Sequence, residues 1–170
     1  MGMDVSGINP QCNKPVKDFP MLVKWEEIPY GERDEEEWKK EQEQYWKENE
    51  EFNKANVGVY FRNNCWWWRP LWNFCYTIAP ELIDEKTFQS GHCNDGAGLD
   101  DINATKLGVK LLSLIEDGTA AHHEKEITLA NEKEIADNPD SGLAGAYPFS
   151  VENVNEFANF CIQSGGFEIW

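Results

Sequence analysis

Residues 60–72 read YFRNNCWWWRPLW, which places tryptophan at four of the seven positions from 66 to 72. A tryptophan in a protein core buries a large apolar surface, but its indole N–H still needs a hydrogen-bond acceptor. Trp66, Trp67 and Trp68 are consecutive, so they cannot all face the same way in a helix or in a strand. We therefore expect at least one of these rings to point away from the main core.

The polar neighbours of these tryptophans suit a planar or anionic ligand. The chain has three arginines, and two of them, Arg62 and Arg69, bracket the run. Guanidinium groups bind anions and stack on indole rings, while Asn63 and Asn64 supply amide donors and acceptors. The same residues would also suit a plain core with capped edges, so both interpretations stay open here.

A second motif is the segment GHCNDG at residues 91–96, in which Asn-Asp-Gly is typical of a turn. A purely structural turn is the simplest interpretation. In a functional interpretation, His92 titrates near neutral pH, and Asp95 orients it or contacts a ligand. No serine or cysteine nucleophile with a suitably spaced base can be assigned, so no catalytic residue is predicted. A small enzyme that uses His92 and Asp95 is kept as a third hypothesis, after the two functions given at the end of this section. The predicted ligand-binding residues are Arg62, Asn63, Asn64, Trp66, Trp67, Trp68, Arg69, His92, Asn94 and Asp95.

The spacing of apolar residues predicts an α+β fold that is mainly helical, with about five helices and a small β element of two or three strands. Residues 57–61 and 167–170 are the strand candidates, and we expect them to pair with each other. Asp84 is expected to cap a short turn, and Pro70 is expected in the first turn of a central buried helix. The predicted helix starts are Asp34, Pro70, Asp100 or Asp101, Thr119 and Ser150.

The domain organisation follows from the distribution of prolines and glycines. Residues 1–31 are punctuated by both, which indicates an extended N-terminal arm over the surface. Residues 32–170 form the predicted single domain, a length that can bury a substantial core. Within it, residues 137–146 are expected to be a loop.

The charge balance excludes one class of function. The chain carries 31 acidic and 15 basic side chains, a net charge of −16, whereas a broad nucleic-acid surface needs clustered lysine and arginine. An acidic surface permits solubility, the attraction of cationic partners, or mimicry of nucleic-acid phosphates. The acidic run from Glu32 to Glu51 is the candidate for such mimicry, although a solvated helix face is the simpler interpretation.

The sequence predicts no metal site and no cofactor. The five cysteines contain no C-x-x-C pair, and we interpret them as reduced thiols. His122 and Glu126 lie one helical turn apart next to His123, but a third ligand is missing nearby. A solvated helix face is therefore preferred there. No apolar run approaches the length that spans a bilayer.

Three motifs together resemble a family of uncharacterised bacteriophage proteins. They are the Trp-rich run at 60–72, the loop at 91–96, and an ending that reads YPFSVENV at 147–154 and SGGFEI at 164–169. Members of that family often carry a Cys-rich, zinc-knuckle-like insert before the final motif, where this chain has only residues 137–146, without cysteine. The resemblance implies a phage origin and the cytoplasm of an infected bacterial host. It implies no established activity, so no functional residues are carried over.

Two functions follow as expectations. In the first, the chain is a phage accessory protein that holds a small nucleotide-like or anionic ligand at the Trp/Arg/Asn site. Such a protein is a binding protein more than an enzyme, and one use would be to sequester a host defence signal. In the alternative, an acidic protein inhibits a host enzyme as a nucleic-acid mimic. The expected partners are thus a small molecule or a host bacterial protein, without direct contact to nucleic acid or membrane.

Overall fold

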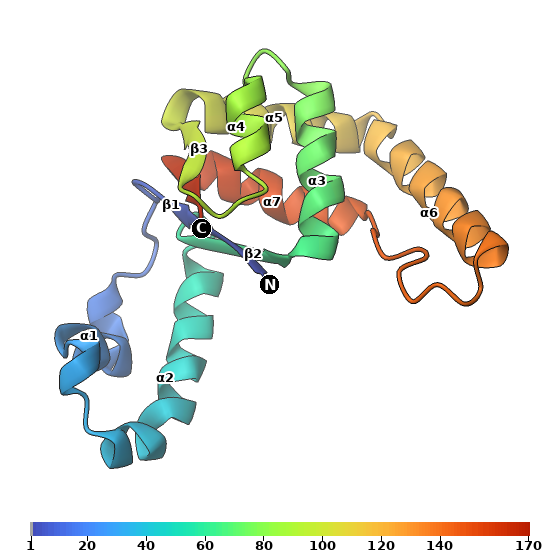
Figure 1. Cartoon of the computed structure of the whole chain (residues 1–170). Helices are drawn as coiled ribbons and strands as arrows, with labels where there is room; N and C mark the ends of the chain where they lie inside the picture. Colours follow the sequence, from blue (N-terminus) through green and yellow to red (C-terminus); the bar gives the residue numbers. More distant parts are fainter. Residues whose placement is uncertain (1) are drawn as a thin grey trace.

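The fold consists of a four-stranded antiparallel sheet covered by helices, with two helical segments that project from this body (Figure 1). The computed structural model describes residues 2–170. In the sheet order β2-β1-β4-β3, the strands are β1 (Gly2–Gly7), β2 (Tyr60–Asn64), β3 (Ala97–Asp100) and β4 (Gly166–Ile169). The predicted α+β class is confirmed, but the sheet in the described residues is larger than the two or three strands expected.

Seven α-helices occur within residues 2–170, where about five were predicted. They are α1 (Pro20–Glu27), α2 (Glu35–Ala55), α3 (Cys65–Ile78), α4 (Glu85–Ser90), α5 (Asp101–Glu116), α6 (Thr119–Asp137) and α7 (Val151–Gln163). Two short 3-10 helices, η1 (Val16–Asp18) and η2 (Tyr30–Glu32), flank α1.

Most predicted helix starts are confirmed by their caps. The side chains of Asp34 and Asp100 each accept the backbone N–H of the residue three positions later. Asp84, which was expected to cap a short turn, accepts the Thr87 N–H in the same way and starts helix α4. Ser150 does the same at the start of α7. These bonds satisfy donors that the first helical turn leaves without a partner, which is why an Asp or Ser before an apolar stripe marks a helix start reliably.

Strand β1 corrects two predictions. Val5 lies opposite Phe61 of β2 on one side and opposite Ile169 of β4 on the other, so the two predicted strands flank β1 and do not pair with each other. Met3 and Val5 are buried. Residues 2–7 therefore lie inside the sheet, and with α1 following them, the first 31 residues are not one extended arm. This short period-two pattern was hidden among the neighbouring glycines and prolines.

Helix α3 begins five residues earlier than predicted. Asn64 is its N-cap, and the Asn64 side-chain oxygen accepts the N–H groups of Trp66 and Trp67 at 3.0 and 3.1 Å. The tryptophan run is thus the first turn of the helix, and Pro70 lies inside it. A proline there removes one helical hydrogen bond. Strong N-capping by Asn64 and the burial of one helix face outweigh that loss.

The buried face of α3 forms the centre of the core. Trp68 and Trp72 are fully buried and stack with their ring centroids 5.4 Å apart. Their indole N–H groups donate to the carbonyl oxygens of Gly91 at 2.8 Å and Phe88 at 3.0 Å. Phe157 of α7 packs edge-on against Trp68. Both indoles therefore have the acceptors that burial requires, and α4 with the following loop supplies them.

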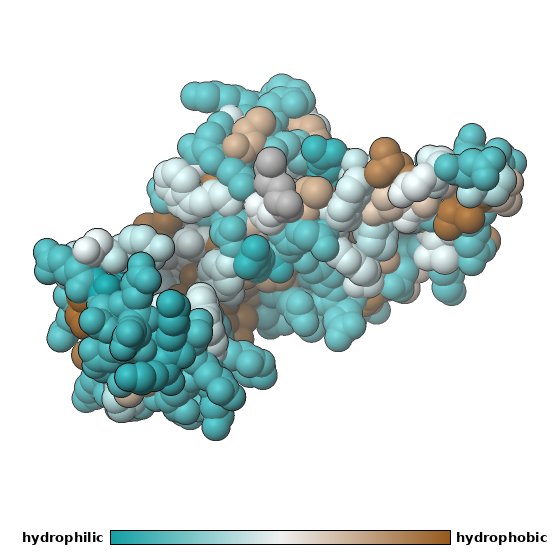
Figure 2. Space-filling view, turned by 60° about the horizontal axis from the view of Figure 1, so that its bottom comes forward, coloured by the Kyte–Doolittle hydropathy of each residue, from teal (hydrophilic) through white to brown (hydrophobic). Residues whose placement is uncertain are grey.

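Helices α1 and α2 form a hairpin that projects from the body, whereas α6 projects on the opposite side (Figure 1). The hairpin has a small core of its own, in which buried Trp25 meets Trp38 edge-on at 5.0 Å. Lys24 Nζ lies 2.6 Å from the carboxylates of both Glu37 and Glu41. Figure 2 shows that the hairpin surface is mainly hydrophilic and that apolar surface emerges where the hairpin meets the body.

Candidate functional site

Arg62, Asn63 and Asn64, the last three residues of β2, all have partners within the protein. Arg62 Nε lies 3.4 Å from a carboxylate oxygen of Asp4, and the Asn63 amide donates to the side-chain oxygen of Asn153 at 2.9 Å. Asn64 caps α3. The structure thus gives each of them a role in joining elements. It does not bring Arg62 to the cavity that Arg69 lines.

The consecutive tryptophans divide as expected between the core and its edge. Trp68 is sealed in the core and has no face open to solvent, so it is not available for stacking on a ligand. Trp66 and Trp67 are half-buried. Trp66 packs on Tyr147, with the ring centroids 5.1 Å apart. Of the three rings, Trp66 is therefore the one that contacts Tyr147, the residue to which Arg69 also binds.

The loop after α4 braces the N-terminus of β1 and the core. Asn94 adopts a left-handed conformation, with φ at 53°, and its amide donates to the Gly2 carbonyl at 3.0 Å. Asp95 accepts the Ala97 N–H at 3.3 Å. His92 packs edge-on against Phe88, and burial, followed by the positive charge of Arg69, lowers its pKa. These contacts explain the turn sequence, and a ligand-binding role for His92, Asn94 or Asp95 stays a prediction.

Arg69 differs from the other two arginines. Arg33 donates to the carbonyl oxygens of Trp25 and Ile28, and Arg62 has the carboxylate of Asp4. Arg69 donates to the hydroxyl of Tyr147 at 2.8 Å and lies over that ring at 5.9 Å. Within residues 2–170, no carboxylate lies within ion-pair distance of it. Arg69 thus presents an uncompensated positive charge, held in place by an aromatic side chain.

This arginine lies at the rim of a cavity of about 480 Å³ between α3, α6 and the segment before α7, which we call the Arg69 groove. Pro70, Phe74, Ile78 and Ile127 supply apolar surface. The remaining lining residues carry polar groups: Arg69, Asn73, Thr77, His123, Asn131 and Tyr147. None of the lining residues is acidic, in a chain with 31 acidic side chains. The local charge of the groove is therefore opposite to that of the whole chain.

His123 forms part of the groove wall as an aromatic ring. It stacks on Phe74 with centroids 4.9 Å apart and meets Phe149 edge-on at 4.7 Å. Burial lowers the pKa of His123, although the nearby carboxylate of Glu126 opposes that shift. Neutral imidazole is consequently the favoured form at neutral pH, and Arg69 is left as the charged group of the groove.

Acid should destabilise the protein through this histidine. Folded His123 binds a proton less readily than unfolded His123 does. As the pH falls below the ordinary histidine pKa of 6.5, the unfolded state therefore takes up the proton first, and the unfolding free energy decreases until the pH has passed the folded pKa. We expect His123→Asn to lose less unfolding free energy than the wild type between pH 7 and pH 5, as measured by urea denaturation. Equal losses in the two proteins would refute this assignment.

Several groove residues were not predicted from the sequence. Tyr147 and Asn131 follow Arg69 by more than sixty positions, and the Asn131 amide donates to the Tyr147 carbonyl at 3.1 Å. No local pattern links them to α3. The YPF segment that begins at Tyr147 is part of the motif at 147–154, and its two aromatic rings were the available signal.

The described residues contain neither a metal-binding cluster nor a helix suited to cross a membrane. Among residues 2–170, no group of three or more His, Cys, Asp or Glu side chains is arranged to hold a metal ion. His122 and Glu126 do approach each other, at 3.5 Å. None of the helices described for residues 2–170 combines the length and the apolar character needed to cross a membrane.

Comparison of the chain with protein-family models, with curated proteins and with solved structures found no match. The chemistry of the Arg69 groove is thus the basis for assigning a ligand.

Proposed function

We propose that the protein binds a small anionic, nucleotide-like ligand in the Arg69 groove and that it acts by binding rather than by catalysis. One observation carries this proposal: an arginine without a carboxylate partner in the described residues lies at the rim of a cavity that no acidic residue lines. An arginine binds a phosphate group through several parallel hydrogen bonds. In a chain with a net charge of −16, such a pocket is selective by charge.

The rest of the groove suits the uncharged part of such a ligand. Pro70, Ile78 and Ile127 are partly exposed and offer apolar surface for a flat base, as small-ligand sites commonly do. The Asn73 side-chain amide lies at the groove and makes no hydrogen bond within residues 2–170, so it is free to donate to and accept from a base edge. The cavity volume of about 480 Å³ lies in the usual range for small-molecule sites.

The biological use that fits best is sequestration of a host signal. The resemblance to bacteriophage proteins suggests an accessory protein in an infected bacterium, and a phage gains from removing a nucleotide that signals infection. A protein that only binds needs an anchor for the phosphate and a shaped groove. Arg69, Asn73 and the apolar floor supply both, so no catalytic group is invoked.

Arg69→Ala should abolish most of the binding. We expect nucleoside monophosphates or cyclic dinucleotides to raise the melting temperature of the wild type, by about 5–10 °C at a hundredfold excess over the dissociation constant. Loss of a charge-assisted hydrogen-bond donor should weaken binding by about ten- to a hundredfold.

Arg62→Ala is the matched control, because Arg62 is exposed and pairs with Asp4 outside the groove. It should bind like the wild type. A nucleotide screen without any thermal shift, or an equal shift in the Arg69 variant, would contradict the proposed function.

A second candidate function, inhibition of a host enzyme by an acidic surface, rests on the hairpin. Helix α2 projects from the body (Figure 1), and its first turn carries Glu35, Glu36 and Glu37. A projecting acidic helix could imitate a row of phosphates. Replacing these three residues by glutamine should then abolish a salt-sensitive capture of a nucleic-acid enzyme from bacterial lysate, whereas Arg69→Ala should not affect it.

A further inference from the structure

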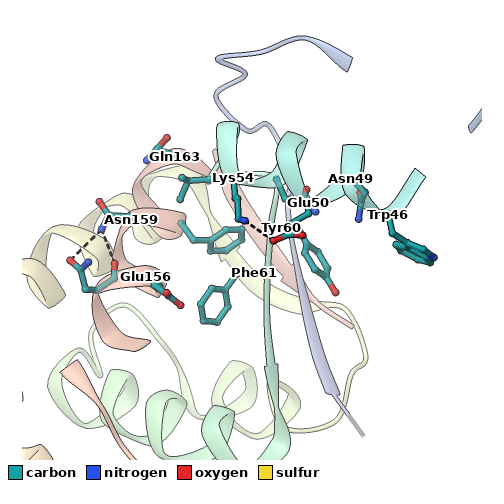
Figure 3. Close-up of a pocket in the computed structure, with 13 residues that line it drawn as sticks. Trp46, Asn49, Glu50, Lys54, Tyr60, Phe61, Glu156, Asn159 and Gln163 are labelled. Atoms are coloured by element: carbon teal, nitrogen blue, oxygen red, sulfur yellow. Dashed lines mark hydrogen bonds and ion pairs between the residues drawn. The ribbon is translucent and has the colours of Figure 1, made fainter. Parts of the chain in front are cut away.

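A second cavity, of about 650 Å³, lies between the C-terminal half of α2, the start of β2 and one face of α7 (Figure 3). It shares no lining residue with the Arg69 groove. Its floor is apolar, since Phe61 and Phe160 are buried there. We call it the amide cavity, because five asparagine and glutamine side chains line it beside apolar surface: Asn49, Asn53, Asn155, Asn159 and Gln163.

These amides come from two helical faces that oppose each other across the floor. Asn49 and Asn53 lie one turn apart on α2, whereas Asn159 and Gln163 lie one turn apart on α7. In Figure 3, the α2 residues line one side of the cavity and the α7 residues another. Residues four apart share a helix face, so each helix presents a ladder of amides to the space between them.

Three of the amides are free for a ligand. Within residues 2–170, the side chains of Asn49, Asn53 and Gln163 make no hydrogen bond, whereas Asn159 donates to Asn155. A primary amide offers two donors and an acceptor. A ligand with many hydroxyl groups, each both donor and acceptor, matches that set, and a purely apolar ligand would leave the amides unsatisfied.

The charges of the amide cavity disfavour anions. Lys54 is neutralised by Glu50, whose carboxylate lies 2.5 Å from Lys54 Nζ and whose pKa this contact lowers. Glu156 also lines the cavity, and no cation lies within ion-pair distance of it in the described residues. The net charge of the walls is therefore negative. A phosphate group, which suits the Arg69 groove, is repelled here.

An aromatic platform completes the site. Trp46 lines the cavity on α2, and 56% of its surface is exposed. An exposed indole presents a flat apolar face on which a ligand can pack. Free amides, a negative wall and this face together describe a ligand that is neutral, rich in hydroxyl groups and apolar on one side. We propose that the amide cavity binds a saccharide, independently of ligand binding in the Arg69 groove.

The test uses neutral trisaccharides of glucose and of N-acetylglucosamine (maltotriose, cellotriose and chitotriose) at millimolar concentration. In ¹⁵N-labelled protein, we expect at least one of them to shift the indole signal of Trp46 and the side-chain amide signals of Asn49, Asn53 and Gln163. AMP should leave these signals unchanged. Trp46→Ala and Asn53→Ala should each weaken saccharide binding by about five- to tenfold.

Two controls separate this result from the function proposed above. Gln42→Ala, on α2 outside the cavity, should bind saccharide like the wild type, and Arg69→Ala should also bind it unchanged. The proposal is overturned if no trisaccharide moves the Trp46 signal, or if Trp46→Ala and Asn53→Ala, shown by circular dichroism to be folded, bind with unchanged affinity.

Discussion

Trp68→Ala is expected to lower the unfolding free energy by about 3–5 kcal/mol, a large part of the stability of a typical domain. Trp68 is fully buried between Trp72 and Phe157. Its removal leaves a cavity at the centre of the core and also leaves the Gly91 carbonyl without its donor. Both effects act in the same direction.

Trp67→Ala provides the matched comparison one position earlier in the same helical turn. Its ring is only half-buried, so the loss should be clearly smaller. Chemical denaturation of the two variants, with far-UV circular dichroism as the signal, measures the difference. Equal losses, or a larger loss at Trp67, would show that the first turn of α3 faces the core differently.

Asn56→Ala is expected to lower the unfolding free energy by about 3 kcal/mol, an unusual loss for a polar residue. Asn56 is fully buried where α2 ends. Its side-chain oxygen accepts the N–H groups of Asn13 at 2.7 Å and Lys14 at 3.0 Å. Its amide donates to the carbonyls of Lys14 at 2.9 Å and Phe52 at 3.0 Å. One side chain thus ties the segment before α1 to the end of α2.

Hydrogen exchange separates this role from a general loss of stability. The amides of Asn13 and Lys14 should exchange faster in the Asn56 variant than its global stability requires, because their acceptor is gone. Gln42→Ala, on the exposed part of α2, should change the stability by no more than about 0.5 kcal/mol. Unchanged exchange at Asn13 and Lys14 would contradict the role assigned to Asn56.

The sequence predicted the elements whose signals are local. Capping residues such as Asp34 and Ser150 announce a helix because their side chains bond to backbone groups three residues away. The strand β3 (Ala97–Asp100) was missed because alanine and glycine carry no strand preference. It exists because its backbone pairs with β4, and that partner lies about seventy residues later.

The candidate site could likewise be predicted from the sequence only where its signals are local. The expectation that consecutive indoles must divide between core and surface rests on local backbone geometry, in a helix or in a strand, and Trp66 and Trp68 do divide in that way. Which polar residues meet around Arg69 depends on where α6 and Tyr147 lie in space. Arg62 lies close to Arg69 in the sequence but pairs with Asp4 of β1. This pairing could not be predicted, because strand β1 itself was not predicted.

The amide cavity could not be predicted from the sequence either. In the sequence, Trp46, Asn49 and Asn53 lie among charged and polar residues, as the residues of an ordinary solvated helix face do. Their meaning depends on α7, which lies about a hundred residues later and faces them across the cavity. A ladder of amides on each of two helices becomes a binding feature only when the helices oppose each other.

The side-chain Nε–H signals of arginine test the anionic-ligand proposal most directly. With three arginines in the chain, ¹⁵N-labelled protein gives three such signals, and Arg69→Lys identifies one of them. On titration with AMP, we predict that the Arg69 signal moves, that those of Arg33 and Arg62 stay in place, and that uncharged adenosine moves the Arg69 signal far less. An Arg69 signal that does not move at saturating AMP would contradict the assignment of the groove as an anion site.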